Sequence, residues 1–492
     1  MPLTAYPGFC EGTYRDPRAA ILGIDRCANL VPARLPSTGK NNIALVNVPG
    51  KTLASTLATS PGRGTWSGDE TRLFCVSGSK WYEVATATGT AQDRGDVGND
   101  NNPVTIFSNG EATGGQLAII SNSKLYVDSG GAASGANAVE ITTCPASVAA
   151  GGNGVAGGCT VAGYAIVFEL NTNNVYISAI KDFTTWDPLD TQIWYGSQDR
   201  IMQLIPDGDD RFWVMGRKSG VAWRNVGGTG FPFARVQGSA INTGLAGQYS
   251  WALVPDANGS DRICFLSRSD RGGPTVYMFD GYRTVSLTST APGIESLIGS
   301  YSTYLDCVAN GHIRDSHRIL SLHFPTALAC LCYDFSTGLW HERYSGAPAT
   351  YTEPVGRFHT APIVTTSHYW LSGSTGKLYK DDTTIVTEDG IDIYWDRTGP
   401  NAHNADHQIF VGSFRLDCEL ATNIDVSLAC SLDNGVNFGS ERNRNTGASG
   451  KTLTIVEWGR NGSGRSFIPR VRGTGKIKIT NAMVDIEDGS GF

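Results

Sequence analysis

Short apolar strands alternate with polar turns along most of the chain, and the second strand of each pair carries an aromatic residue. Leu73–Val76 leads through a four-residue turn to Tyr82, and Leu117–Ile120 leads through a similar turn to Tyr126. Five looser copies follow, and the seven hairpins exit at Tyr82, Tyr126, Tyr176, Trp223, Tyr277, Tyr333 and Tyr379. Successive aromatics are 44 to 56 residues apart. A period of about 40 to 55 residues with several strands per period is typical of a β-propeller. We therefore predict an all-β propeller of six to eight blades, with the seven aromatics packed inside the blades.

The first 60 residues do not follow this repeat. Prolines are spaced so that no long helix can form there, at Pro7, Pro17, Pro32, Pro36 and Pro49. We predict an extended N-terminal arm or first strands over 1–60, which could complete a blade at the far end of the propeller. The propeller itself is predicted over 61–390, with a mobile Gly- and Ala-rich connection from Ala132 to Gly158.

A different rhythm begins near Ile391, where strands become longer and alternate strictly. The apolar residues that share one parity are Phe410, Phe414, Leu416, Cys418 and Leu420, followed by Ile424, Val426 and Leu428, and then Ile477 and Ile479. Alternation with a period of two suits strands that bury one face. The sequence therefore predicts a C-terminal β-sandwich over 391–492.

Composition narrows the partners that the protein can have. Charged residues make up 17% of the chain, against about 25% in typical soluble domains. Neutral surfaces of this kind favour contacts with other subunits, and a turn-rich monomer is the alternative. The net charge is −7 and no basic run is present, which disfavours tight binding of nucleic acid. No apolar stretch reaches 18 residues, so we expect that the chain does not insert into a membrane. We also expect that it is made in the cytoplasm.

The cysteines and histidines show no metal-binding spacing. The 11 cysteines include no Cys-x-x-Cys pair, and we predict buried free thiols. His403 and His407 have the i, i+4 spacing of a helical metal pair, but Pro400 argues against a helix. His312 and His317, near Asp315, are predicted in a loop. We expect no metal and no cofactor.

One short motif resembles the Asp box of sialidases and other carbohydrate-processing propellers, and it consists of Ser431, Asp433, Gly435 and Phe438. It is a hairpin turn in which Asp433 is expected to accept hydrogen bonds from amides two residues on, while Gly435 supplies a positive φ and Phe438 packs beneath. A single copy outside the repeats indicates a structural turn. Similarly, Trp186-Asp187 is predicted to be an ordinary blade-connecting turn.

No catalytic constellation is present in the sequence. The carboxylate pairs Asp209-Asp210 and Asp381-Asp382 lie in predicted turns, and there is no nucleophile elbow, P-loop or dinucleotide fingerprint. We therefore predict that the protein is not an enzyme.

Several segments, taken in order, resemble the tail nozzle or packaged-DNA stabilisation proteins of short-tailed bacteriophages. The matching segments are 29–32 with 49–50, 185–188, 199–201, 244–247, 276–281, 293–295 with Tyr301, 337–343, 431–442 and 458–460. The resemblance implies a structural virion protein in the phage tail, assembled in the host cytoplasm as a homo-oligomer of six copies beneath the portal and the head–tail adaptor proteins. It also implies that the ring extends the channel, retains packaged DNA and docks a plug or needle and tail fibres or spikes, while DNA passes without tight binding.

Two other classes of function remain open. A carbohydrate-active propeller, either a sialidase-like hydrolase or a lectin, would use the Asp box and the 11 Trp and 18 Tyr residues. A monomeric interaction scaffold would share the fold without the family resemblance.

Overall fold

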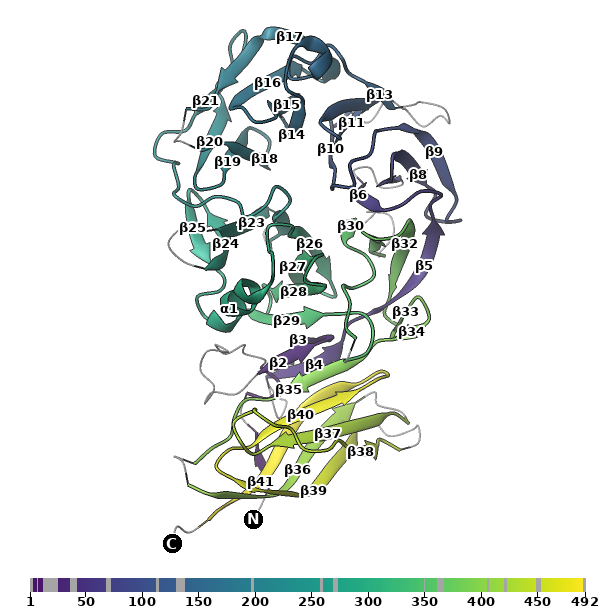
Figure 1. Cartoon of the computed structure of the whole chain (residues 1–492), viewed down its shortest axis with the longest axis vertical. Helices are drawn as coiled ribbons and strands as arrows, with labels where there is room; N and C mark the ends of the chain where they lie inside the picture. The colour runs from purple at the N-terminus through teal and green to yellow at the C-terminus, as the bar shows by residue number, and fades with distance from the viewer. Residues whose placement is uncertain are drawn as a thin grey trace.

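The computed structural model describes residues 3–6, 8–11, 25–35, 42–67, 72–111, 115–129, 138–195, 199–256, 260–268, 273–348, 350–360, 367–404, 407–419, 423–447 and 453–489. Within these residues the protein is almost entirely β-structure. Seven blades form a ring, and a smaller two-sheet body lies below it in Figure 1. The predicted all-β fold, a propeller with a C-terminal sandwich, is confirmed.

Each blade is an antiparallel meander of four strands that runs from the axis to the rim. The strands of blades 1 to 3 are β6 (Gly62–Trp66), β7 (Leu73–Ser77), β8 (Lys80–Val84), β9 (Ala91–Asp96), β10 (Thr105–Ser108), β11 (Leu117–Ser121), β12 (Lys124–Asp128), β13 (Ala138–Glu140), β14 (Val155–Val161), β15 (Tyr164–Glu169), β16 (Asn174–Ala179) and β17 (Asp182–Ile193). Those of blades 4 and 5 are β18 (Ile201–Asp207), β19 (Arg211–Gly216), β20 (Gly220–Asn225), β21 (Phe233–Arg235), β22 (Trp251–Pro255), β23 (Asp261–Arg268), β24 (Pro274–Asp280) and β25 (Arg283–Ser286). Those of blades 6 and 7 are β26 (Val308–Arg314), β27 (His317–Phe324), β28 (Ala329–Asp334), β29 (Leu339–Arg343), β30 (Phe358–Thr360), β31 (Tyr369–Leu371) and β32 (Lys377–Asp382).

The seven repeat aromatics all lie on the third strand of a blade, namely on β8, β12, β16, β20, β24, β28 and β32. Tyr82, Trp223 and Tyr379 are among those that are buried. Tyr82 of blade 1 packs in one cluster with Leu371 and Leu378 of blade 7. The periodic residues therefore help to fill the interfaces on which radial stacking depends.

The N-terminal segment closes the ring. β5 (Gly50–Thr56) pairs antiparallel with β32, so the outer strand of blade 7 comes from the start of the chain. Two short strands, β33 (Thr387–Glu388) and β34 (Ile391–Asp392), continue this sheet. The segment predicted as an arm thus completes the last blade.

The sandwich is built from both ends of the chain. One sheet contains β3 (Leu30–Arg34), β4 (Ile43–Asn47), β41 (Lys478–Asp488), β36 (Ile409–Glu419) and β39 (Thr454–Gly464), with β1 (Thr4–Ala5) paired to β41. The other contains β2 (Arg26–Ala28), β35 (Trp395–Thr398), β40 (Ile468–Gly473), β37 (Asp425–Ser431) and β38 (Arg442–Asn445). Ala28 of β2 pairs with both Glu342 of blade 6 and Asp396 of β35, so one continuous sheet joins the two bodies.

The predicted parity of the sandwich strands is wrong at one position. Phe414, Leu416 and Cys418 are fully buried, but Phe410 is 46% exposed and Val411 is buried in its place. The pairing register of β36 shifts between Val411 and Ser413. This β-bulge inserts one residue and reverses the faces on either side of it. Leu420 lies outside the described residues.

The connection predicted from Ala132 to Gly158 is not a simple loop. It contains the outer strand of blade 2, a 3₁₀ turn at Val148–Ala150 and the first residues of β14. Residues 132–137 lie outside the described part of the chain. The low apolar content of this segment suggested a loop. The prediction failed because a short outer strand buries little surface and needs few apolar residues.

Few features depart from β-structure in the described residues. The α-helix there is α1 (Pro292–Ser300), and no described helix is long and apolar enough to cross a membrane. The prediction of buried thiols is confirmed, since none of the 11 cysteines, all in the described ranges, forms a disulfide; ten are buried and Cys430 is half-buried.

Candidate functional site at the propeller axis

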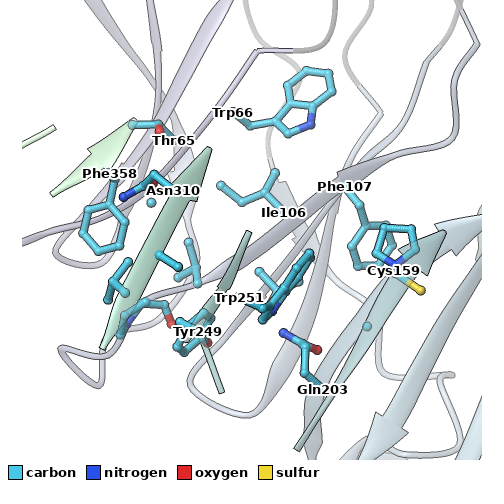
Figure 2. A pocket seen from close by; sticks show the side chains of 18 of the residues that line it. Thr65, Trp66, Ile106, Phe107, Cys159, Gln203, Tyr249, Trp251, Asn310 and Phe358 are labelled. Atoms are coloured by element: carbon cyan, nitrogen blue, oxygen red, sulfur yellow. Dashed lines mark hydrogen bonds between the residues drawn. The ribbon is translucent and has the colours of Figure 1, made fainter. Parts of the chain in front are cut away.

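The innermost strands of all seven blades surround a cavity of about 360 Å³ on the propeller axis, called here the axial cavity. Residues on β6, β10, β14, β18, β22, β26 and β30 contribute to its wall. Figure 2 shows that Trp66, Ile106, Trp251 and Phe358 gather around it from different blades. The wall is therefore assembled from residues that are far apart in the sequence.

A hydrogen bond crosses the axis beside this cavity. The hydroxyl of Tyr249, just before β22 of blade 5, donates to the carbonyl oxygen of Pro103, just before β10 of blade 2, at 2.7 Å. Both residues also line a second cavity of about 530 Å³, which includes Asn102 and Leu305. Burial raises the pKa of Tyr249 to about 12, so this hydroxyl keeps its proton. The contact lies in the wall that the two cavities share.

The wall of the axial cavity carries no charged side chain among the described residues. Its polar side chains include Gln203, Asn310 and His359. Asn310 is satisfied, because its Nδ2 donates to the Arg357 carbonyl at 2.7 Å and its Oδ1 accepts from the His359 amide at 3.3 Å. Burial holds the pKa of His359 well below its usual value, with His368 as the next cause. The cavity is thus neutral near pH 7.

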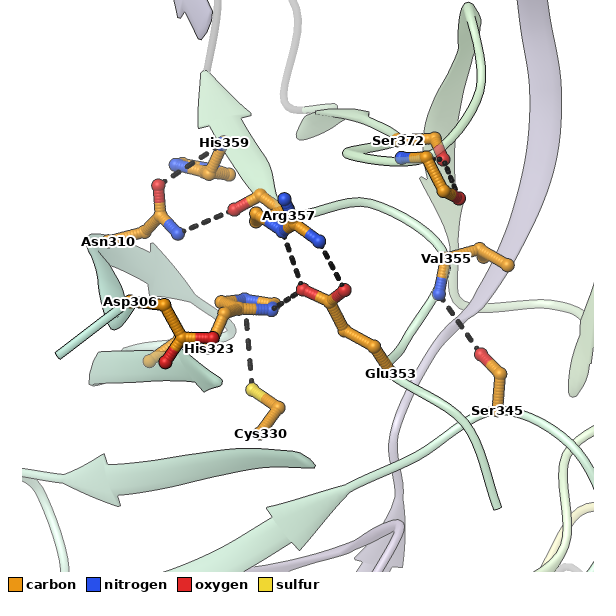
Figure 3. Close-up of polar contacts among 12 residues, drawn as sticks. Asp306, Asn310, His323, Cys330, Ser345, Glu353, Val355, Arg357, His359 and Ser372 are labelled. Atoms are coloured by element: carbon orange, nitrogen blue, oxygen red, sulfur yellow. Dashed lines mark hydrogen bonds and ion pairs between the residues drawn. The ribbon is translucent and has the colours of Figure 1, made fainter. Parts of the chain in front are cut away.

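A second group of polar residues, the blade 6–7 cluster, lies between those two blades. It consists of Lys51, His312, His323, Arg343, Glu353, Arg357, His359 and Glu388. Figure 3 shows Glu353 receiving two hydrogen bonds from Arg357, at 2.8 and 2.7 Å, with His323 on its other side at 3.6 Å. Burial alone would raise the pKa of Glu353, but the hydrogen bonds from Arg357 and the nearby ring of His323 lower it to about 2.

The closure strand enters this cluster through one side chain. Lys51 of β5 is 1% exposed, donates to the Val355 carbonyl and lies over the ring of Trp370 at 4.6 Å. Burial and Arg343 lower its pKa to about 8. Glu388 lies 3.9 Å from Lys51 and 3.3 Å from Arg343. These contacts fix the last blade to blade 6, and their geometry is that of a structural cluster.

The histidines that the sequence singled out do not meet. His312 lies on β26 and is buried, whereas His317 begins β27 and its Nδ1 lies 2.6 Å from Asp334. The predicted loop between them is only the tight turn at Asp315 and Ser316 of a hairpin. His403 and His407 are exposed and non-helical. No group of three or more His, Cys, Asp or Glu side chains in the described ranges is placed to hold a metal ion.

The Asp-box turn lies at the end of β37 in the sandwich, away from the axis. The Ser431 hydroxyl accepts from the Gly435 amide at 2.9 Å, and Asp433 accepts from the Asn437 amide at 2.9 Å. Asp433 therefore accepts from the amide four residues on. The prediction that it accepts from amides two residues on is wrong, because the Gly435 amide donates to Ser431. Gly435 has φ +87°, and Phe438 packs under the Arg470 guanidinium at 4.1 Å.

Sequence reasoning found the blade aromatics but missed the axial residues. None of the seven repeat aromatics lines the axial cavity. Trp66, Trp251 and Phe358 precede the third-strand aromatics of their blades by 16, 26 and 21 residues. The axial residues could have been located by counting back from each third-strand aromatic to the first strand of its repeat. The number of residues between them differs from blade to blade.

Comparisons with solved structures return matches at low similarity. The N-terminal domain of Nup159 has 9% identity and a TM-score of 0.40, covering 72% of this chain and 98% of that one. A putative 6-phosphogluconolactonase from Bacteroides uniformis has 12% identity and a TM-score of 0.39, covering 64% and 94%. An exo-β-1,3-galactanase from Phanerochaete chrysosporium has 11% identity and a TM-score of 0.30, covering 89% and 99%. A search of curated proteins found no match.

Fold and axis together define a seven-bladed β-propeller with a closed axis, fused to a β-sandwich that contains both chain ends. The model of the family described as bacteriophage P22 Gp10, beta-propeller, matches residues 25–352. The chain belongs to this phage stabilisation family, and it is a phage structural protein. The matched range begins within the N-terminal segment that closes the ring.

Proposed function

We propose that this chain is the subunit of a tail nozzle in a short-tailed phage. In this proposal six copies form a ring beneath the head–tail adaptor, extend the portal channel and retain packaged DNA. The ring also docks a plug or needle and tail fibres or spikes, and it assembles in the host cytoplasm before it becomes part of the virion tail. The family match over residues 25–352 carries the proposal.

The closed axis supports a ring of several copies. A duplex cannot pass through a propeller whose blades 2 and 5 are joined across the axis by Tyr249 and Pro103. A conduit made from this chain must therefore run between subunits. A net charge of −7 suits such a conduit, since DNA has to slide through it without being held by many phosphate contacts.

The rim of blade 3, far from the sandwich in Figure 1, supports contacts between copies. Leu189 on β17 is 85% exposed and Tyr195, just after it, is 78% exposed. On the neighbouring blade, Val226 is 66% exposed. Exposed apolar groups of this size favour burial against another protein surface.

The axial cavity argues against the hydrolase alternative. Glycosidases use a pair of carboxyl groups, and none of the described residues lining this cavity is Asp or Glu. A sialoside would also bring a carboxylate, and none of the described residues that line this cavity is Lys or Arg. We therefore propose a protein that acts without catalysis.

Electron microscopy and light scattering of the purified chain, alone and with its adaptor ring, test the proposal. We expect a closed ring in the presence of the adaptor, and phage particles that lack the chain should lose their packaged DNA. Leu189→Asp combined with Tyr195→Asp should impair ring formation. Val436→Asp is the matched control, since Val436 is 73% exposed on the sandwich. A stable monomer with adaptor present that also cleaves a reporter sialoside would refute the nozzle function.

A further inference from the structure

The described wall of the axial cavity contains three polar groups that the fold leaves unused, one amide and two hydroxyls. Gln203 on β18 is 1% exposed, and its Oε1 accepts a hydrogen bond from the Leu204 amide at 3.0 Å. Among the described residues nothing accepts a hydrogen bond from its Nε2, which Figure 2 shows directed toward Trp251. The hydroxyls of Thr160 on β14 and of Thr105 on β10 are also buried without a partner in the described part of the chain.

Unpaired polar groups inside a protein are costly, so this cavity favours an occupant that can pair with them. Leaving a buried amide or hydroxyl without a hydrogen bond costs about 1–3 kcal/mol. Gln203 offers a donor, and the Thr160 hydroxyl can donate or accept. A suitable ligand therefore presents oxygen atoms or hydroxyl groups toward blades 3 and 4.

The other parts of the wall are aromatic. Trp66 comes from blade 1, Trp251 from blade 5 and Phe358 from blade 7. Ligand sites commonly combine such apolar walls with a few polar groups that fix orientation. A sugar ring matches this combination, because its C–H face packs on aromatic rings while its hydroxyl groups donate and accept hydrogen bonds.

Because the described wall carries no charge, it favours neutral sugars over charged sugars and other charged ligands. Burying a charged ligand without a partner is strongly unfavourable, which disfavours phosphates, nucleotides and sialic acids. The volume of about 360 Å³ lies near the lower limit of ordinary ligand pockets and suits a small molecule. Because no carboxylate lines the described wall, a bound glycoside would not be hydrolysed.

From this combination we infer that the axial cavity is a binding site for a small neutral sugar, which is held by Gln203 and Thr160 against Trp66, Trp251 and Phe358 and is not cleaved. This site goes beyond the nozzle function and does not depend on it. A ring of subunits could assemble with the cavity filled by water alone.

Saturation-transfer NMR on the full chain tests the inference. The probes are glucose, galactose and N-acetylglucosamine, with N-acetylneuraminic acid and adenosine as comparators. We expect at least one neutral sugar to receive saturation at its ring protons at millimolar concentration, and neither comparator to do so. Gln203→Leu should raise the Kd of that sugar about fivefold, the effect of losing one neutral hydrogen bond.

Two further variants make the result decisive. Thr160→Val keeps the side-chain shape, removes the unpaired hydroxyl and should also raise Kd about fivefold. If Gln203→Leu fails to fold, as judged by its Tm, this variant decides alone. Gln192→Leu, on the exposed face of β17, is the control and should leave Kd within twofold. The inference is overturned if no neutral sugar binds, if adenosine binds in their place, or if the folded cavity variants bind as the control does.

Discussion

Asp25 and Arg397 form an ion pair inside the sandwich, with side chains only 1% and 0% exposed. The same guanidinium donates to the carbonyl oxygens of Phe9, Arg26 and Thr398. Arg397 belongs to β35, after the propeller, and the other groups come mainly from the start of the chain. One side chain therefore holds the N-terminal segment in the C-terminal domain.

Replacing Arg397 should destabilise the sandwich strongly. Arg397→Met removes the guanidinium that pairs with the buried Asp25 carboxylate, and breaking a buried pair in this way costs about 3–5 kcal/mol. Chemical denaturation measures the loss. Arg235→Met, at an exposed position on β21, is the control and should change stability by less than about 0.5 kcal/mol. Equal stability of the two variants would show that the Asp25–Arg397 pair does not stabilise the docking of the N-terminal segment in the sandwich.

Covalent linkage of β5 to blade 7 should stabilise the ring. Thr52 and Lys380 are cross-strand partners at the closure, so Thr52→Cys with Lys380→Cys should form a disulfide on oxidation. The bridge should add about 2–4 kcal/mol to the free energy of unfolding, and reduction should remove the gain. Thr52→Cys alone is the control. Failure of the pair to cross-link in the folded protein would contradict closure by β5.

Acid should loosen the junction of blades 6 and 7. Burial is the main cause that holds the pKa values of His312 and His359 well below 6.5, so the unfolded chain binds more protons than the folded one in mild acid. The stability that these histidines provide is complete above about pH 6.5 and falls as pH drops below it, by up to about 1.4 kcal/mol per pH unit for each. The charged and titratable groups that face them are Lys51, Arg314, His323, Arg343 and His368.

Two variants isolate this effect. His312→Phe removes one buried imidazole, and the pH dependence of unfolding between about pH 5 and 6.5 should become shallower. His403→Phe removes an exposed imidazole and should leave the slope unchanged. Urea denaturation at several pH values measures both. An unchanged slope in His312→Phe would mean that this side chain does not control acid stability.

Removing the hydrogen bond between Tyr249 and Pro103 tests whether the DNA conduit runs between subunits or along the propeller axis. Tyr249→Phe removes the hydroxyl that donates to Pro103 and should cost about 1 kcal/mol. If the conduit runs between subunits, phage particles carrying this variant should retain DNA as the wild type does, as measured by the fraction of filled heads. Leakage from particles whose chain loses no more stability than one hydrogen bond provides would instead locate the conduit on the propeller axis.

The fold was predictable where similar residues recur at the same position of each repeat. It was less predictable where two paired strands lie far apart in the sequence. Tyr82 and Tyr126 follow nearly identical hairpins, so the repeat was visible. The pairing of β5 with β32 was foreseeable only as a general means of ring closure. Phe410 was assigned to the wrong face because a bulge shifts parity without a strong sequence signal, although Gly412 marks its position.

The axial cavity was not predictable from the sequence. Its wall takes between one and four residues from each first strand, and these differ in type, as Trp66, Thr160 and Gln203 show. Their shared surroundings arise only when the seven blades close into a ring. The blade 6–7 cluster is similar, since Lys51 is separated from His323 and Arg343 by most of the propeller sequence.

Closure of blade 7 by β5 also sets the order of events during synthesis. β5 ends at Thr56, but its partner β32 begins only at Lys377. At about 5–20 residues per second, a ribosome needs roughly 15–60 s to make the intervening chain. During that time β5 leaves the ribosome without the strand it pairs with, and β1 and β4 wait longer still for β41. The nascent chain therefore reaches its native connectivity only after β32 and β41 have been made, and its early strands are open to mispairing or to chaperones until then.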